Sequence, residues 1–306
     1  MHIRPLCLFI GLAGLRVFGF VTDPWLSDER IHQVTGEPTR FGRPRDPAVA
    51  VKIVTWNIER GQAYPAVLAV LRGLDPDVIL LQEVDDGCRR SGYRKVAKDL
   101  ADTLGMNWVA SGEFQELGEG RAGDPALTGQ AVLSRFAIDD ADPVRFKAQD
   151  RWRWSINPVQ PRRGGRLALR VRTAGLLFYN AHIESGGDEA LQRKQMAEIV
   201  ADAADAGGKT PVLIAGDFNN RIPRTALTFP ALLEASFVDA LGDDAARGPT
   251  SRGRRHPIDW MFVKRAAAAD GRIIQAPSAS DHSPLITTLL PWPSPAARYV
   301  GPQVAR

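Results

Sequence analysis

Cysteine is scarce in this sequence of 306 residues, which contains two, Cys7 and Cys88. Two cysteines cannot form the several bridges of a disulfide-stabilised domain, and they cannot supply a four-thiolate zinc site. The sequence therefore excludes both of these classes of protein. It leaves the redox environment of the chain undetermined.

Long apolar runs are scarce as well, and the one at the N-terminus is short. Residues 6–20 are mostly apolar, but Arg16 interrupts them, and a helix that spans a bilayer needs about 20 apolar residues. The basic start of the chain resembles a secretory signal, although no small-x-small cleavage site follows Phe20. Two interpretations of residues 1–20 stay open: export or membrane tethering through this segment, and a cytoplasmic location.

Neither sign of charge dominates, since 39 basic residues oppose 35 acidic ones for a net charge of +4. This balance permits an anionic substrate without requiring one. The chain is 44% hydrophobic and 24% charged, which provides a sizeable core and excludes a chain that is disordered overall. Nothing in the composition indicates an obligate protein partner.

The chain divides into four regions by composition. A polar, proline-containing region without apolar periodicity predicts a linker over residues 21–47, after the N-terminal segment 1–20. One folded domain is expected over residues 48–292, followed by a proline-rich tail over residues 293–306.

Short β-rich runs alternate with helical patterns through the expected domain. Strands are predicted at residues 51–56, 78–82, 131–133, 167–171, 176–181, 212–215, 260–263 and 285–290. Apolar residues at helical spacing predict helices within residues 63–74, 96–104 and 196–203. The strands at 167–171 and 176–181 are expected to form an antiparallel hairpin, and the whole pattern indicates a mixed α/β layered fold.

Isolated polar residues lie at or just beyond the ends of the predicted strands. They are Asn57, Glu83, His182, Asp217, Asn219, Asp259, Asp281 and His282. Each one alone is typical of a turn or a solvated strand end, but polar groups at strand ends tend to meet at one rim of a sheet. The joint pattern therefore favours a functional site.

Oxygen ligands dominate this set of residues. A carboxylate such as Glu83 beside an amide such as Asn57 suits Mg²⁺, which takes one or two protein carboxylates and keeps several waters. Attack of water on phosphorus needs a base, a cation and hydrogen-bond donors to the phosphate oxygens. A histidine beside a carboxylate is favoured as the imidazolium, which can contact phosphate or relay a proton. The set predicts phosphate-ester chemistry.

Seven ordered sequence blocks resemble the endonuclease/exonuclease/phosphatase superfamily, the DNase-I-like group. The blocks are Thr55-Trp56-Asn57-Ile58, Leu81-Gln82-Glu83-Val84, Gly129-Gln130-Ala131-Val132-Leu133-Ser134-Arg135, Tyr179-Asn180-Ala181-His182-Ile183-Glu184-Ser185, Gly216-Asp217-Phe218-Asn219, Ile258-Asp259-Trp260 and Ser280-Asp281-His282-Ser283-Pro284. Each block alone is a weak signal. Together they cover nearly all of the expected domain.

The resemblance implies a four-layer α/β sandwich, in which two packed mixed β-sheets are flanked by helices. It implies that Glu83 binds Mg²⁺ or Mn²⁺, with Asn57 beside it and Asp281 close to the metal. Further roles follow for the other residues: Asp217 orients or deprotonates water, Asn219 holds water and phosphate, Asp259 orients His282, and His182 is a second phosphate-binding or acid histidine. Whether Asp217 or His282 is the base stays open, because coupled groups share such a role.

One position departs from the family pattern, and a second has two possible interpretations. Gln130 stands where the family usually has asparagine, which implies an altered supporting hydrogen bond. Glu59 is either a second metal carboxylate or a solvated loop residue. Because His182 replaces the tyrosine of the abasic-site nucleases, the chain resembles the DNase-I, sphingomyelinase and phosphatase branches more closely.

A basic segment offers candidate substrate contacts. Residues 145–172 contain nine arginines or lysines and one acid, and cations alternate with aromatic rings at Arg151, Trp152, Arg153 and Trp154, while Arg255 precedes Asp259. Such a segment tracks a nucleic-acid backbone, docks on an anionic membrane, or is a solvated loop. The three interpretations stay open.

The sequence thus predicts a Mg²⁺-dependent phosphoesterase that hydrolyses a phosphodiester or phosphomonoester by attack of water. The substrate classes are nucleic acid, a lipid headgroup or a small phosphate ester. A narrower alternative is an endonuclease of the DNase-I type. An alternative of another class is an inactive binding scaffold on the same fold.

Overall fold

The computed structural model describes residues 25–42, 45–46, 48–150, 160–185, 189–220, 229–242 and 248–291. Expectations for residues 1–20 and 293–306, and for Arg151, Trp152, Arg153 and Trp154, lie outside these ranges. In the described ranges, no helix has both the length and the apolar character needed to cross a membrane.

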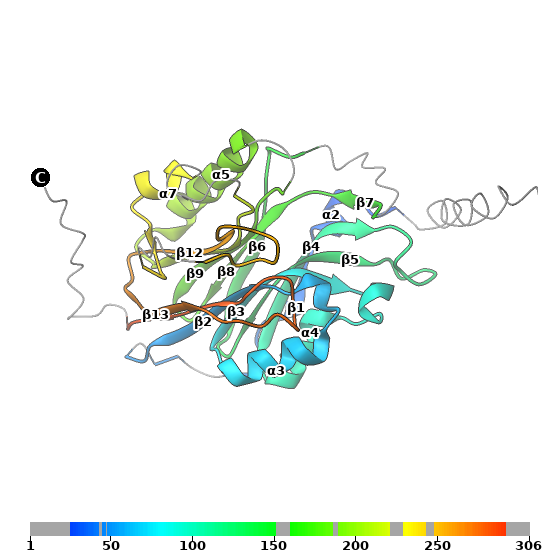
Figure 1. Cartoon of the computed structure of the whole chain (residues 1–306), viewed down its shortest axis with the longest axis horizontal. Coiled ribbons are helices and arrows are strands. Elements are labelled where there is room, and N and C mark those ends of the chain that lie inside the picture. The colour runs from blue at the N-terminus through cyan, green and yellow to red at the C-terminus, as the bar shows by residue number, and fades with distance from the viewer. Residues whose placement is uncertain are drawn as a thin grey trace, which may run out of the picture.

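Two mixed β-sheets form the centre of the fold (Figure 1). The first sheet has the order β1-β4-β5-β3-β2-β14-β13, with β7 paired to β4, and the second has the order β11-β12-β10-β9-β8-β6. The strands of the first sheet are β1 (Val34–Glu37), β2 (Val51–Asn57), β3 (Val78–Asp86), β4 (Asn107–Glu116), β5 (Leu127–Ser134), β7 (Arg162–Gly164), β13 (Ala268–Ile273) and β14 (Leu285–Leu289). Those of the second are β6 (Ile138–Arg145), β8 (Leu167–Thr173), β9 (Leu176–His182), β10 (Val212–Asp217), β11 (Val238–Asp239) and β12 (Asp259–Lys264).

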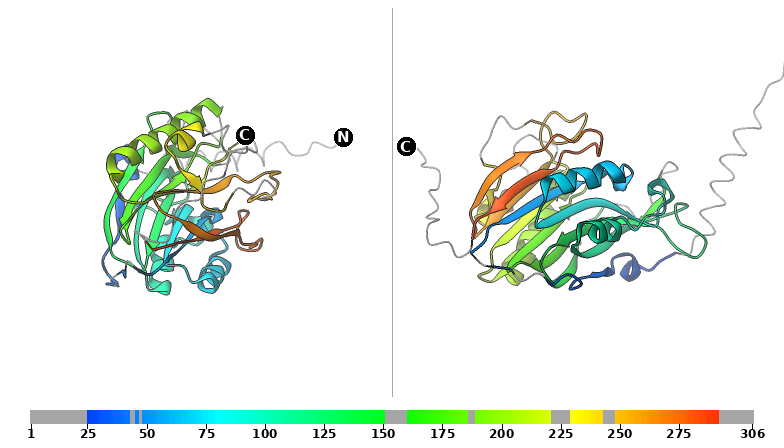
Figure 2. Two further views of the ribbon diagram at one scale, coloured as in Figure 1. Left: turned by 90° about the vertical axis from the view of Figure 1, so that its left-hand side faces the viewer. Right: turned by 90° about the horizontal axis from the view of Figure 1, so that it is seen from below.

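Helices cover the outer faces of both sheets, as Figure 2 shows from the side. They are α2 (Asp28–Ile31), α3 (Tyr64–Leu74), α4 (Val96–Leu104), α5 (Glu189–Gly207) and α7 (Pro230–Glu234), with 3₁₀ turns η1 (Glu59–Gly61) and η2 (Arg89–Ser91). Leu71 of α3 and Leu100 of α4 pack on the first sheet, whereas Met196 of α5 packs on the second. The resulting four layers confirm the α/β sandwich.

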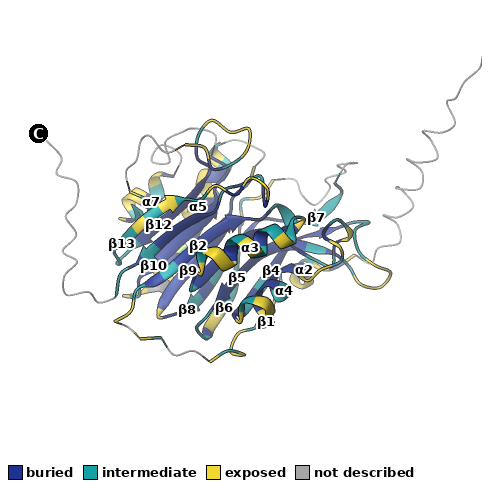
Figure 3. Cartoon of the chain, turned by 60° about the horizontal axis from the view of Figure 1, so that its bottom comes forward, coloured by how far each residue is buried: buried dark blue, intermediate teal, exposed yellow. Residues whose placement is uncertain are grey.

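The core between the two sheets is apolar. Ile53 and Leu80 of the first sheet pack in one cluster with Leu169, Phe178 and Leu213 of the second. Each of these side chains is fully buried, because successive strand residues point to opposite faces and one face of each sheet turns inward. Figure 3 shows the buried strands between the more exposed helices.

The fold begins earlier than the sequence indicates. The region expected as a linker contains α2 and also β1, which pairs antiparallel with β4 from Val34 to Glu37. The Leu26 amide donates to Gln115 Oε1 at 3.0 Å, and Ser111 Oγ donates to the His32 carbonyl at 2.9 Å. Backbone pairing and side-chain hydrogen bonds, rather than apolar periodicity, attach this polar segment to the sheet.

Two β-α-β crossovers position the functional residues. Strands β2 and β3, joined through α3, are parallel, and so are β9 and β10, joined through α5. The carboxyl ends of neighbouring parallel strands lie at one edge of a sheet, where ligand sites form in α/β proteins. Asn57 therefore lies beside Gln82, and Asp217 lies beside His182.

A buried polar bridge joins the sheets next to this edge. Gln82 Nε2 of β3 donates to Asn180 Oδ1 of β9 at 2.6 Å, and Asn180 Nδ2 donates to the Leu81 carbonyl at 2.7 Å. Both side chains are fully buried, so the bonds replace the water that the amides give up on folding. The bridge holds the strand ends of the two sheets together.

Candidate functional site

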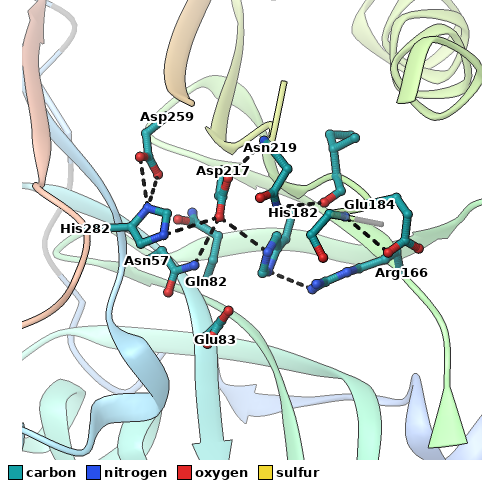
Figure 4. Close-up of polar contacts among 12 residues, drawn as sticks. Asn57, Gln82, Glu83, Arg166, His182, Glu184, Asp217, Asn219, Asp259 and His282 are labelled. Carbon is teal, nitrogen blue, oxygen red and sulfur yellow. Dashed lines mark hydrogen bonds and ion pairs between the residues drawn. The ribbon is translucent and has the colours of Figure 1, made fainter. Parts of the chain in front are cut away.

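Asp217, the last residue of β10, lies at the centre of the site (Figure 4). Its Oδ2 accepts a hydrogen bond from Asn57 Nδ2 at 3.2 Å, and its Oδ1 accepts one from the Asn219 backbone amide at 3.0 Å. Two histidines approach the same Oδ2, with His182 Nε2 at 3.4 Å and His282 Nε2 at 3.7 Å. The structure thus brings together residues from four separate sequence blocks.

His282 is held by Asp259. His282 Nδ1 lies 2.9 and 3.1 Å from the two carboxylate oxygens of Asp259, which is opposite Asp217 in the pairing of β10 with β12. Burial alone would lower the pKa of His282, but Asp259 and Asp217 outweigh it and raise the pKa to about 10. The ring is therefore an imidazolium at neutral pH, and its Nε2 proton faces Asp217.

Asp217 itself is a weak acid for an aspartate. Burial, with Asp259 adding to it and His282 opposing it, raises the pKa of Asp217 to about 7. A carboxylate with a pKa near the working pH is suited to take a proton from water. Asp217 is therefore suited to accept a proton, whereas the protonated ring of His282 is suited to donate a hydrogen bond.

Asp217, Asp259 and His282 also form a group that could hold a metal ion, since one ligand atom from each lies within 4.8 Å of the others. In this structure Nδ1 of His282 is already engaged by Asp259. Asp281, although adjacent to His282, is not part of this group.

Glu83 reaches the site through a β-bulge. The pairing of β3 with β5 shifts register between Leu81 and Val84, and Glu83 has a φ of 50°. A bulge re-aims side chains, so Gln82 turns toward Asn180 while Glu83 faces the site. Burial would raise the pKa of Glu83, but Arg60, whose Nε lies 3.6 Å away, helps to hold the pKa below its ordinary value.

Left-handed backbone conformations gather at the site. Glu59, Arg60, Glu83 and Asn219 all have φ values between 47° and 66°, a region that non-glycine residues seldom occupy. Such strain persists where the surrounding structure imposes it, and it concentrates at functional sites. Glu59 contributes directly, because its Oε2 accepts a hydrogen bond from the Asp281 amide at 3.1 Å and so tethers the segment that carries His282.

An arginine loop adjoins the same segment. The Arg252 amide donates to the Asp281 carbonyl at 2.7 Å, and Ser251 forms a β-bridge with His282. Arg252, Arg254 and Arg255 are exposed. The predicted substrate residue Arg255 therefore lies on a loop bonded directly to the site.

The rest of the basic segment behaves differently from a single basic surface. Arg162 pairs with Glu116, Arg163 with Asp28, and Arg170 with Asp142 and Asp202. The sequence suggested these arginines as contacts for an anionic substrate, but in the structure they pair with carboxylates of the same chain. In the described part of residues 145–172 these arginines have carboxylate partners, and the three interpretations of the segment stay predictions.

Sequence reasoning missed two charged residues beneath the site. Arg166 Nη1 lies 3.1 Å from Glu113 Oε2 and 2.8 Å from His182 Nδ1. Burial raises the pKa of Glu113 to about 7, and burial together with Arg166 places the pKa of His182 well below its ordinary value. The shift favours the neutral imidazole at His182, for which the resemblance implied a phosphate-binding or acid role.

Comparison with known proteins agrees with this architecture. The sequence pattern of the Endonuclease/Exonuclease/phosphatase family matches residues 54–282. The uncharacterized protein YbhP of Escherichia coli (strain K12) is 27% identical over 261 residues, which cover 76% of this chain and 94% of YbhP.

Solved structures show the same fold. An endonuclease/exonuclease/phosphatase from Beutenbergia cavernae superposes with a TM-score of 0.59 at 20% identity, covering 81% of this chain and 72% of that one. A 3'-5' exonuclease from Neisseria meningitidis superposes with a TM-score of 0.56 at 21% identity, covering 77% of this chain and 98% of that one. At this level of identity the superpositions establish the fold and no more.

Proposed function

The chain belongs to the endonuclease/exonuclease/phosphatase family, and from this premise we propose that it is a metal-dependent phosphoesterase that hydrolyses a phosphodiester bond by attack of water. One observation carries the proposal: the buried carboxylate of Asp217 is oriented by Asn57 and the Asn219 amide and faces an imidazolium held by Asp259. This arrangement places a base beside a fixed positive charge.

Asp217 is assigned as the base. Asn57 and the Asn219 amide each occupy one position on its carboxylate, and this fixes the direction of the remaining lone pairs toward a water. His282 cannot be the base while it carries both ring protons. It instead donates Nε2–H to a phosphate oxygen and offsets the negative charge that develops there.

Asn57 and Glu83 would hold a Mg²⁺ or Mn²⁺ ion, with Asp281 close by. Carboxylate and amide oxygens fit a hard cation, and the bulge at Glu83 brings its carboxylate to the carboxyl end of β2, where Asn57 lies. The bound cation would supply charge neutralisation at the phosphate. Arg60 Nε lies 3.6 Å from Glu83 Oε2 and pairs with this carboxylate.

Replacing Glu83 with glutamine should weaken the dependence on metal rather than the fold. We expect the Mg²⁺ concentration for half-maximal activity to rise by about 10- to 100-fold, because a neutral amide is a weaker ligand than a carboxylate. Titration of activity with Mg²⁺ measures this. Glu37→Gln, on the exposed edge of β1, is the matched control, and an unchanged Mg²⁺ dependence in Glu83→Gln would remove Glu83 from the metal site.

Replacing Asp259 with asparagine should move the pH profile. His282 must stay protonated, so activity falls as pH rises through its pKa; without the Asp259 carboxylate that pKa drops, and the alkaline limb shifts to lower pH. We expect kcat to fall by about 10- to 100-fold, as for other orienting partners. A pH-rate profile that coincides with that of the unmodified protein would contradict the pairing.

A nuclease is the second candidate function, and the exposed arginine loop favours it. Arg252, Arg254 and Arg255 lie beside His282, where they could bind phosphates that flank the scissile one. The similar Neisseria protein is described as a 3'-5' exonuclease. We propose the same substrate-binding role for Arg151, Trp152, Arg153 and Trp154.

One assay separates these functions. The full chain is incubated with bis(p-nitrophenyl) phosphate, p-nitrophenyl phosphate and supercoiled plasmid, each with Mg²⁺ or with EDTA. Metal-dependent cleavage of the diester supports the proposal, and plasmid nicking that weakens steeply with salt supports the nuclease. Cleavage of the monoester alone would replace diesterase with phosphatase, and no hydrolysis of any substrate would favour the binding scaffold.

A further inference from the structure

A buried row of four side chains leads from the space between the sheets to Asp217. Gln130 Nε2 donates to Glu113 Oε1 at 3.2 Å, and Arg166 Nη1 contacts both Glu113 Oε2 at 3.1 Å and His182 Nδ1 at 2.8 Å. His182 Nε2 then lies 3.4 Å from Asp217 Oδ2. All four residues are at most 5% exposed, and Figure 4 shows Arg166, His182 and Asp217 in sequence.

The proton on His182 can be placed from this geometry. An arginine guanidinium has N–H donors and no acceptor, and it stays protonated in proteins. At 2.8 Å from Arg166 Nη1, His182 Nδ1 must therefore be the acceptor and carry no proton. A neutral imidazole has one N–H, so the proton of His182 is on Nε2, on the side of Asp217.

We propose that Arg166 is a positioning residue that holds His182 in the Nε2–H tautomer, so that His182 orients the Asp217 carboxylate as a neutral donor instead of serving as an acid. This inference rests on the proposed function for the role of Asp217, and it adds Arg166, Glu113 and Gln130 to the residues that serve the site. With His182, the Asp217 carboxylate faces three orienting groups: the Asn57 amide and the Asn219 backbone amide, which donate to it, and His182 Nε2 at 3.4 Å.

Glu113 and Gln130 stabilise this arrangement of Arg166 and His182. A buried guanidinium needs a hydrogen-bonded acidic partner, and Glu113 Oε2 is that partner at 3.1 Å. Gln130 holds Glu113 and also donates to the Leu167 carbonyl at 2.7 Å, next to Arg166 in the chain. The glutamine at position 130, which departs from the usual asparagine, thus takes part in fixing the arginine.

Nitrogen-15 NMR of the full-length protein labelled at histidine tests the proposal directly. Two-bond couplings report which ring nitrogen carries the proton, and loss of one ring pattern in His182→Gln assigns His182. At neutral pH we expect a proton on Nε2 alone. A proton on Nδ1, or on both nitrogens, would overturn the proposal.

Variants at Arg166 test the cause. Arg166→Met should abolish the single-tautomer pattern, Arg166→Lys should restore it in part because lysine also donates, and Arg170→Met in the following strand β8 should leave it intact. Because Arg166→Met leaves the buried Glu113 carboxyl without its partner, the double variant Arg166→Met/Glu113→Gln provides a folded alternative without either ionisable group. A single Nε2–H tautomer that persists in both Met variants would overturn the role of Arg166.

Kinetics separate positioning from substrate binding. We expect Arg166→Met/Glu113→Gln to lower kcat by about 10- to 100-fold with little change in KM, as for partners that orient a catalytic group. A rise in KM with unchanged kcat would make Arg166 a binding residue and overturn the proposal. The spectra need no substrate, so a failure of the proposed function, seen as no hydrolysis, is distinguishable from a failure of this inference, seen as a proton on Nδ1.

Discussion

Substitution of Asp217 by asparagine is expected to lower kcat by about 100- to 10,000-fold, the range over which a general base contributes. Asparagine keeps the size of the side chain but cannot accept a proton from water. The loss should appear in kcat rather than in KM, because in the proposed mechanism His282 and the metal, and not Asp217, hold the substrate phosphate. Steady-state kinetics on bis(p-nitrophenyl) phosphate, with matched Mg²⁺, measure both constants.

A matched variant shows whether the loss is specific. Asp202 of α5 accepts hydrogen bonds from Tyr179 and Arg170, and Asp202→Asn makes the same chemical change away from the site. We expect Asp202→Asn to retain the unmodified kcat. If Asp217→Asn retained kcat as well, His282 would be the remaining candidate for the base and the assignment made here would be wrong.

The acid limb of the pH-rate profile offers an independent reading of Asp217. The base must be deprotonated, so activity should rise as pH increases through the pKa of Asp217, which is about 7 in the metal-free protein. A bound divalent cation nearby lowers that pKa, so the limb should lie at or below this value when Mg²⁺ is present. If a weakly active Asp217→Asn protein showed no acid limb, that result would agree with the assignment of Asp217 as the base.

Much of the site could be predicted from the sequence because it lies at strand ends. Asn57, His182 and Asp217 each end a run rich in apolar and β-branched residues, and such runs are readable as buried strands. The carboxyl ends of parallel strands meet at one edge, so a polar residue after each run indicates a shared site. The structure confirms this pattern, with His182 and Asp217 adjacent in register.

Glu113 was missed because a β-bulge hides its orientation. The pairing of β4 with β5 shifts register between Gly112 and Phe114, which places Glu113 in the interior although the alternation of β4 does not indicate it. Inward and outward positions can be read from a strand only while the period of two is unbroken. Glu83 lies at a bulge as well, but its place at the end of a predicted strand was enough to single it out as a metal carboxylate.

Arg166 was missed because its partner is distant in the sequence. It stands in an arginine-rich segment, where a solvated or substrate-binding role is the ordinary interpretation. Its partner Glu113 is 53 positions away, and nothing local distinguishes a fully buried arginine from its partly buried neighbours. Only the packing of the two sheets brings the pair together beneath His182.

Substitution of Gly216 by alanine is expected to lower the free energy of unfolding by about 2 to 6 kcal/mol, through backbone strain and overpacking together. Gly216 has a φ of +142°, and a Cβ at this position would lie 1.9 Å from the Ala181 carbonyl oxygen. That oxygen belongs to the backbone of β9 and cannot rotate away. Urea denaturation measures the loss.

The matched control is Gly73→Ala in α3, where an added Cβ meets nothing within 4 Å; alanine there should stabilise the protein by about 0.5 to 1 kcal/mol. Gly216 pairs with Ala181 on one side and Trp260 on the other, directly before Asp217 meets His182 and Asp259. Any Gly216→Ala protein that still folds must therefore separate β9 from β10, and kcat should fall with stability. A variant as stable as the unmodified protein would show that the close approach of these strands is not what sets the position of Asp217.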